Sequence, residues 1–407
     1  MTTYITNIGL LATPRGDSAR RGRQQGEITL LRDAWVAVEG GKIAAVGQGQ
    51  PAPEDGDTLL DAGGRLMTPG LVDAHTHLIF GGWRQNELAL KLHGAGYLDI
   101  LAAGGGILST MRATQSASEE QLEAKASAAL DEMLRFGTTT AEAKSGYGLS
   151  TGEECKALRV IGKLQKHHVM DLAATFMGAH AVPEAYRDNR QGYLELLCEE
   201  MLPAVREQGI AEFCDVFCEK GVFSAEESRR ILLTGRQHGL RPKIHADEIE
   251  AIGGSELAGE IGAVSAEHLI VCPPSGIASM AEGGTVACCL PATSFYLGAA
   301  YAPVQDMVQA GVPVAMATDF NPGSCPCLNM QLVISLGCLR YRLTPEQALT
   351  AVTLNGAAAI CRADRIGSIE PGKQADILIW NAEDLDYICY RLGSNLVDTV
   401  IKKGNVV

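Results

Sequence analysis

The sequence lacks any apolar run long enough to cross a membrane. No stretch approaches the ~20 consecutive apolar residues that a transmembrane helix needs. The first apolar segment, residues 5–12, is too short for a signal peptide and is followed by several arginines. Positive charge is also scarce, because 34 Lys and Arg stand against 48 Asp and Glu, for a formal net charge of −14. An acidic chain repels nucleic acid and anionic membranes, so we expect neither as a partner.

The cysteines do not form a disulfide framework. All twelve are scattered, and several stand inside apolar runs, at positions 214, 218, 288 and 289. This pattern is typical of buried free thiols in a reducing compartment, so we expect a cytoplasmic protein. Cys325 and Cys327 are close enough to suggest a thiolate metal site, but no second thiol pair at metal spacing accompanies them.

The two ends of the chain are predicted to be β structure. The 407 residues suffice for one large domain and a smaller one. In residues 1–66, segments 34–38 and 42–46 predict a hairpin around two glycines. Residues 361–407 return to turns and strands. Neither end can bury a core alone, so we expect them to form one small β-sandwich domain together.

Residues 67–360 alternate short apolar strands with helical segments. The first strand ends at His77, and seven more are expected at 138–143, 172–177, 213–218, 242–244, 263–266, 285–290 and 312–317. This alternation predicts an α/β fold, a (β/α)₈ TIM-type barrel.

Three helices in this region have clear signals. Ser118 and Gln121 form a predicted capping box before apolar residues at helical spacing, and a glycine ends that helix. Thr151 and Glu154 predict a second capped helix, and residues 345–360 a final one.

Polar side chains gather where six of the eight strands end, which is where a barrel of this type builds its active site. His75 and His77 share one face of their strand because side chains two residues apart point the same way. His245 follows the fifth strand, His268 the sixth and Asp319 the eighth. Each alone has an ordinary structural explanation, but the joint pattern favours a metal site.

Nitrogen and carboxylate ligands without a thiolate suit Zn²⁺ or iron. Such a metal lowers the pKa of bound water from ~15.7 toward ~7, so hydroxide is available at neutral pH. Asp319 can both bind the metal and accept the proton of the water, and His268 can orient the water or a carbonyl.

These motifs resemble the amidohydrolase superfamily, on residues 69–77, the histidines after strands five and six, and Thr318-Asp319. Finer motifs are similar to those of the imidazolonepropionases of histidine degradation. They lie at residues 81–87, 104–110, 142–149, 178–183, 245–248 and 319–324.

The resemblance implies one divalent metal ion, Zn²⁺ or Fe²⁺/Fe³⁺, held by His75, His77, His245 and Asp319. It implies Glu248, His268 and Asp319 as catalytic residues. It implies substrate contacts from Arg84, Tyr147, His180, Glu248, Asn321, Gly323 and Ser324. Many members of the superfamily bridge two metals with a carboxylated lysine near the end of strand four, where this chain has Lys220, but the resemblance is to one-metal members and implies a single metal.

The implied reaction is the hydrolysis of 4-imidazolone-5-propanoate to N-formimidoyl-L-glutamate by a metal-bound hydroxide. Arg84 offers a bidentate partner for the propanoate, and Tyr147 a hydroxyl. Glu248 can hold or move a proton on the ring nitrogens. Residues 321–324 can bond the tail or the ring. We also expect a homodimer.

Two other functions remain open. A guanine-type aminohydrolase would use the same metal residues but release ammonia, and Arg84 fits a purine carbonyl as well as an acidic tail. The other is a metal-stabilised scaffold that binds a partner and has no catalytic activity. Function retained after loss of the metal would favour it.

Overall fold

The expected barrel strands form one parallel sheet in sequential order. The computed structural model describes residues 2–93 and 105–407, and its eight barrel strands pair from β6 through to β13. They are almost wholly buried, as expected for parallel strands covered by helices. The strands are β6 (Leu71–Asp73), β7 (Thr138–Lys144), β8 (Asp171–Ala179), β9 (Phe213–Cys218), β10 (Arg241–Ala246), β11 (Ser265–His268), β12 (Val286–Cys289) and β13 (Val314–Met316). The barrel prediction is confirmed.

The residues that follow β6 and β13 meet and close the barrel. The backbone N–H of Asp319 donates to the carbonyl of His75 (3.1 Å), and the N–H of His77 donates to the carbonyl of Phe320 (2.9 Å). The hydroxyl of Thr318 donates to the carboxylate of Asp73 at 2.6 Å. Closure therefore brings two segments from opposite ends of the barrel sequence to one point.

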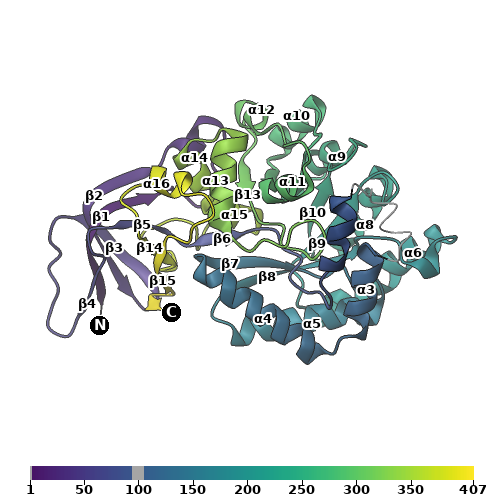
Figure 1. Cartoon of the computed structure of the whole chain (residues 1–407), viewed down its shortest axis with the longest axis horizontal. Helices are drawn as coiled ribbons and strands as arrows, with labels where there is room; N and C mark the ends of the chain where they lie inside the picture. The colour runs from purple at the N-terminus through teal and green to yellow at the C-terminus, as the bar shows by residue number, and fades with distance from the viewer. Residues whose placement is uncertain (1, 94–104) are drawn as a thin grey trace.

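Helices surround the barrel (Figure 1). They are α1 (Leu88–Leu92), α3 (Ile107–Ser116), α4 (Glu119–Arg135), α5 (Thr151–His167), α6 (Arg190–Glu195), α7 (Leu202–Gln208), α8 (Ala225–Gln237), α9 (Gly254–Glu260), α10 (Pro274–Gly283), α11 (Pro291–Leu297), α12 (Val304–Gln309), α13 (Met330–Tyr341), α14 (Pro345–Val352), α15 (Leu354–Ala359) and α16 (Leu385–Tyr390). Short turns of other helix types are η1 (Gly22–Gly26), η2 (Gln85–Glu87), η3 (Glu184–Tyr186) and the π-helix η4 (Leu196–Met201). No helix within residues 2–93 and 105–407 is long and apolar enough to span a membrane.

Two helix predictions needed correction, and one was confirmed. The capping box of Ser118 and Gln121 starts α4 as expected. On α5 the N-cap is Ser150 rather than Thr151 and makes no side-chain cap bond, and the Glu154 carboxylate turns inward to bond other backbone groups. The segment 345–360 is two helices, broken at Thr353, whose hydroxyl donates to the carbonyl of Leu349 at 2.6 Å. Such a bond within a helix bends it and competes with the regular ladder.

The N- and C-terminal segments share one sheet, as expected. Strand β5 (Leu66–Pro69) pairs antiparallel with β14 (Ile377–Trp380). The other strands are β1 (Thr3–Thr13), β2 (Thr29–Glu39), β3 (Lys42–Gln48), β4 (Thr58–Asp61), β15 (Val397–Lys402) and β16 (Asn405–Val406). The predicted hairpin is β2–β3, with Glu39 opposite Lys42.

The small domain is a single mixed sheet rather than two separate sheets of a sandwich. A bulge between Ile5 and Ile8 divides β1. The residues before the bulge pair with β4, and those after it pair with β5. Because a bulge bends and twists a strand, one continuous sheet can enclose the apolar cluster of this domain.

The small sheet contacts the barrel through charged side chains at the start of β8. Lys402, from β15, places its Nζ 2.8 Å from the Asp171 carboxylate and 2.7 Å from that of Asp376. Lys403 and Gln374 also bond Asp171. These contacts lie at the ends of the barrel strands opposite to His75 and Asp319.

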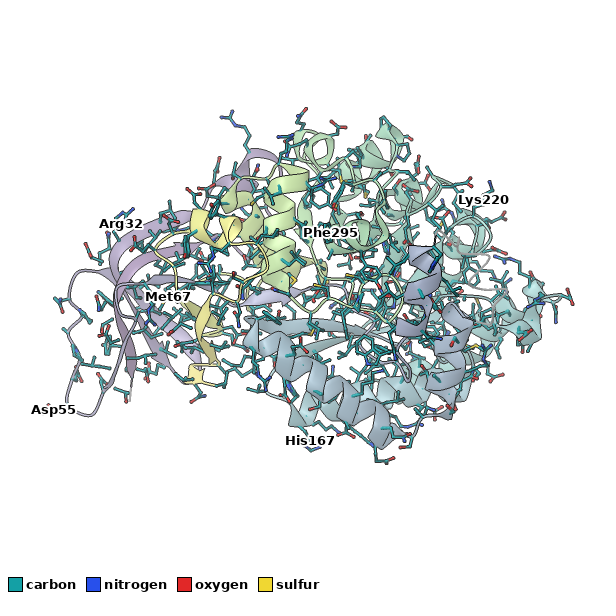
Figure 2. All side chains as sticks on the ribbon, in the orientation of Figure 1. Arg32, Asp55, Met67, His167, Lys220 and Phe295 are labelled. Atoms are coloured by element: carbon teal, nitrogen blue, oxygen red, sulfur yellow. The ribbon has the colours of Figure 1, made fainter. Side chains whose placement is uncertain are left out.

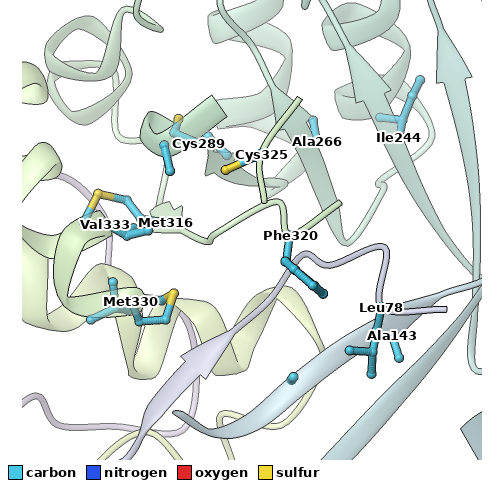
Figure 3. Close-up of a cluster of buried hydrophobic side chains, with 14 of the residues drawn as sticks. Leu78, Ala143, Ile244, Ala266, Cys289, Met316, Phe320, Cys325, Met330 and Val333 are labelled. Carbon is cyan, nitrogen blue, oxygen red and sulfur yellow. The ribbon is translucent and has the colours of Figure 1, made fainter. Parts of the chain in front are cut away.

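Buried apolar side chains from the barrel strands and the segments around them form one large core, part of which is shown in Figure 3. Leu78, Phe320 and Cys325 are almost fully buried there. All twelve cysteines are free thiols, as expected. Cys325 therefore belongs to the apolar core.

Candidate active site

Four predicted ligands converge at the carboxyl ends of the barrel strands. The two Nε2 atoms of His77 and His245 lie 3.2 Å apart. Oδ1 of Asp319 lies 3.4 Å from Nε2 of His75 and 3.6 Å from Nε2 of His77. Nitrogen and oxygen ligands at ~2.0–2.1 Å from a tetrahedral zinc ion are themselves about 3.3–3.4 Å apart. The spacing of these atoms fits a metal ion.

The hydrogen bonding of the cluster also fits a metal ion. Among the described residues, Nε2 of His75 and Oδ1 of Asp319 are buried without a hydrogen-bond partner. A buried polar atom left unpaired costs about 1–3 kcal/mol. Such atoms facing one another are unfavourable unless a cation lies between them, so the donor set suits a divalent ion.

Three of the four ligands are held from behind by a buried group. Nδ1 of His75 lies 3.0 Å from Glu267, and Nδ1 of His245 lies 3.1 Å from Asp215. Each carboxylate accepts the Nδ1–H and so leaves Nε2 with its lone pair directed at the metal position. The hydroxyl of Thr293 donates to the second oxygen of Asp319 at 2.6 Å.

Two buried lysines compensate these carboxylates. Nζ of Lys144 lies 2.7 Å from Asp215 and 2.8 Å from Glu142. Nζ of Lys243 lies 2.8 Å from Glu142 and 3.4 Å from Glu267. Burial acts to raise the pKa of Asp215, but the neighbouring His245 and Lys144 hold that pKa well below its ordinary value.

Two of the predicted catalytic residues, His268 and Glu248, face each other beside the cluster. Nε2 of His268 lies 3.7 Å from the Glu248 carboxylate. Burial raises the pKa of Glu248 to about 7 and lowers the pKa of His268 to about 4. His268 and Asp319 both have left-handed backbone, with φ of 69° and 55°. Strained backbone of this kind is concentrated at functional sites.

His180 and Tyr147 pack against the ligand His77. The ring of His180 stacks on that of His77, with centroids 4.8 Å apart and an interplanar angle of 21°. Tyr147 lies 5.1 Å from the His180 ring and is almost fully buried. Burial lowers the pKa of His180 to about 3, so its ring is neutral at physiological pH.

Arg84 lies against residue 323 of the 319–325 loop. Its guanidinium bonds the buried Glu87 carboxylate through Nε and Nη2, at 3.0 Å each. A Cβ on Gly323 would stand 2.2 Å from Nη1 of Arg84, so only glycine allows this approach.

Asn321 organises the loop that it belongs to. Its side-chain oxygen accepts hydrogen bonds from the backbone N–H of Gly323 (2.8 Å) and of Ser324 (2.7 Å). Its amide nitrogen donates to the carbonyl of Asp319 and to the hydroxyl of Ser324. Asn321 and Ser324 therefore lie at the predicted site, with hydrogen bonds to one another.

Comparison with known proteins agrees with this geometry. A model of the amidohydrolase family matches residues 66–407. This chain belongs to the amidohydrolase family. Similar curated relatives are the imidazolonepropionases of Alkaliphilus metalliredigens (strain QYMF), 51% identical over 409 aligned positions (99% of this chain, 97% of the relative), and of Streptococcus gordonii, 51% identical over 390 positions (95% and 93%).

Solved structures of amidohydrolase fold resemble the chain more distantly. E. coli guanine deaminase superposes with a TM-score of 0.75 at 17% identity, covering 100% of this chain and 99% of that one. An adenosine deaminase from Xanthomonas campestris, with bound zinc, gives 0.72 at 21% identity, covering 99% and 92%. At these identities the likeness concerns the fold alone.

Lys220 lies away from the metal cluster of this amidohydrolase. It is at the periphery of the barrel domain (Figure 2) and pairs with Glu250 at 2.8 Å. Gly104, the first residue of the motif at residues 104–110, lies outside the described residues.

Sequence reasoning missed the groups behind the ligands. Asp215, Glu142 and Lys144 stand inside buried strands, and Lys243 precedes a ligand by two residues. The available signal was a charged residue within an apolar strand, since such residues are almost never buried unpaired.

Proposed function

We propose that this amidohydrolase opens the ring of 4-imidazolone-5-propanoate by hydrolysis of its cyclic amide, which yields N-formimidoyl-L-glutamate. The observation that carries the proposal is the relatedness at about half identity to imidazolonepropionases across nearly the whole chain. The residues at the strand ends have the chemistry that this reaction requires.

We propose that His75, His77, His245 and Asp319 hold one divalent ion, Zn²⁺ or Fe²⁺/Fe³⁺. When bound, the ion would polarise the substrate carbonyl and lower the pKa of a water molecule. Buried carboxylates outnumber the two buried lysines around the ligands, so the surroundings favour a bound cation.

We propose that Arg84 and Tyr147 bind the propanoate tail. Glu87 fixes the plane of the Arg84 guanidinium, so the cation is oriented before the substrate arrives. His180, neutral and stacked on His77, is placed to bond a ring atom of the substrate. Residues 321–324 bond one another and lie beside Arg84, and we propose Asn321, Gly323 and Ser324 as further substrate contacts.

Three groups are available for the proton transfers. Asp319 and His268 are proposed to orient the attacking water and take its proton. Glu248 is proposed to deliver a proton to the ring nitrogen that leaves, because a pKa near 7 allows it both to accept and to release a proton at neutral pH.

The decisive experiment supplies purified, metal-loaded protein with 4-imidazolone-5-propanoate, with and without a chelator, and measures formimidoylglutamate and ammonia together. We expect chelator-sensitive formimidoylglutamate without ammonia. A parallel incubation uses guanine or a related amine as substrate. Release of ammonia there, without ring opening of the imidazolone, would instead assign the chain to the aminohydrolases. A function that is fully retained after removal of the metal would favour the scaffold without catalytic activity.

The domain bounds, location and oligomeric state are further proposals. We propose a barrel domain at 67–360 and a small domain made of 1–66 and 361–407, although β5 extends the small sheet to Pro69. We also propose a cytoplasmic location and a homodimer.

A further inference from the structure

Glu154 is a buried carboxylate whose hydrogen bonds go to one loop. Its side chain is on α5, and the residue is 0% exposed. Oε1 accepts from the backbone N–H of Gly148 and of Leu149, both at 2.8 Å, and Oε2 accepts from that of Gly146 at 3.1 Å. One carboxylate therefore holds three of the four backbone N–H groups of residues 146–149.

The loop needs to be held, because its backbone is unusual. Gly146 has φ of +107°, and Leu149 has φ of +55° although it carries a side chain. A non-glycine residue in the left-handed region costs of order 1–3 kcal/mol. At Gly148 a Cβ would stand 2.6 Å from the backbone of Glu153 and Glu154, so the loop also lies directly against the start of α5.

The same loop carries groups of the proposed substrate site. Tyr147 stands between the bonded residues, and its ring centroid is 5.9 Å from that of His77. The carbonyl of Gly146 lies 3.0 Å from Nδ1 of His180, whose ring stacks on His77. Nδ1 therefore donates to this carbonyl, and Nε2 of His180 is the acceptor directed elsewhere.

We propose that Glu154 is a positioning residue of the substrate site. Its carboxylate fixes the 146–149 loop so that Tyr147 and His180 are in place before substrate binds. This inference rests on the proposed function, in which those two residues contact the substrate. Preorganised contacts raise affinity because substrate binding then does not incur the entropic cost of ordering the loop.

The first test is kinetic, on the metal-loaded full chain. Glu154→Gln keeps the shape of the side chain, but its NH₂ group faces a backbone N–H in place of an acceptor. We expect KM for 4-imidazolone-5-propanoate to rise about tenfold in Glu154→Gln and about a hundredfold in Glu154→Ala, from the loss of charge-assisted hydrogen bonds. The effect on kcat should be smaller, and metal content should be unchanged.

The matched control is Glu153→Gln, one residue earlier on the same helix. Glu153 is half-buried and pairs with Lys156. This variant loses the same charge from the same turn without touching the loop, so its KM should stay within twofold of the wild type.

The second test needs no substrate. Hydrogen exchange of the Gly146, Gly148 and Leu149 amides should accelerate at least about tenfold in Glu154→Gln and stay unchanged in Glu153→Gln. Unchanged exchange in Glu154→Gln overturns the proposal, even if the wild type does not turn over the imidazolone. Faster exchange with an unchanged KM also overturns it, because the loop would then be held but not used. Absence of turnover by the wild type contradicts the proposed function instead, and the exchange result still decides whether Glu154 holds the loop.

Discussion

Charged groups occupy both ends of the barrel strands, and the two sets differ in how completely they are paired. At the end that faces the small domain, Asp171 and Asp376 bond Lys402, and both also accept from Gln374. At the opposite end, atoms of His75 and Asp319 are buried without hydrogen-bond partners among the described residues.

The difference separates structural from functional charge. In a closed ion network each charged group is paired within the protein. Such a network holds two parts of the chain together and needs no ligand. An open network, in which the remaining lone pairs point at one position, is unfavourable unless a ligand completes it. Active sites of this fold lie at the carboxyl ends of the strands, and the opposite face contributes stability. The following predictions test this contrast, from the largest expected effect to the smallest.

Asp319→Ala, in the open network, should abolish turnover. The variant removes a proposed metal ligand and proton acceptor together, so we expect kcat to fall at least about 10³-fold. Turnover and metal content of the purified protein measure the effect. Asp171→Ala, at the closed end, should keep turnover within a few-fold. Equal losses in both variants would mean that the contrast is wrong.

Glu248→Gln should remove a proton carrier and change the pH profile. We expect kcat to fall by about 10²–10⁴-fold, as for the loss of a general acid–base group. Since Glu248 is proposed to donate a proton and its pKa is raised to about 7, the protonated form is lost as pH rises through 7. The kcat/KM of the wild type should therefore decline above that pH, and the decline should be absent in the variant.

Glu250→Gln is the control for Glu248, because Glu250 is exposed and pairs with Lys220. Its pH profile should match that of the wild type. A Glu248→Gln profile that still declines above pH 7 would assign that decline to another group.

Asp215→Asn should weaken the metal site without removing a ligand. The amide cannot provide a charged acceptor for the Nδ1–H of His245, and Lys144 loses one of its two carboxylates. We expect the dissociation constant for Zn²⁺ to rise about 10–100-fold, measured by competition with a chelator. Asp171→Asn should leave this constant unchanged. If Asp215→Asn binds the metal as tightly as the wild type, the backing carboxylates do not tune the ligands.

Asp171→Asn should affect stability alone. Burial acts to raise the pKa of Asp171, but Lys402, Lys403 and Gln374 lower it to about 2. A lowered pKa means that the stabilisation is present above about pH 4 and is lost as pH falls through 2. Because the side chain is 38% exposed, we expect only about 1 kcal/mol or less. Denaturant unfolding at pH 7 and pH 3 measures it, and a larger loss at pH 3 than at pH 7 would reverse the sign.

Much of this protein could be predicted from residue types and spacing. The eight strands were found because buried parallel strands are continuous apolar runs, and the α4 capping box because its signal is local. Thr151 and Glu154 carried the same local signal, yet the Glu154 carboxylate bonds a loop instead. A capping motif states what a side chain can bond, and tertiary contacts decide which partner it takes.

The sequence by itself determined which side chains meet. In a closed barrel all carboxyl ends of the strands lie on one face, so His75, His77, His245, His268 and Asp319 had to come together once the strands were identified. Only the tertiary structure decided what stands behind them. Asp215 orients His245, Glu267 orients His75, and Lys144 and Lys243 neutralise those carboxylates. These pairings join residues far apart in the chain, and their strength comes from burial. Neither the distance nor the local dielectric exists before the chain is folded.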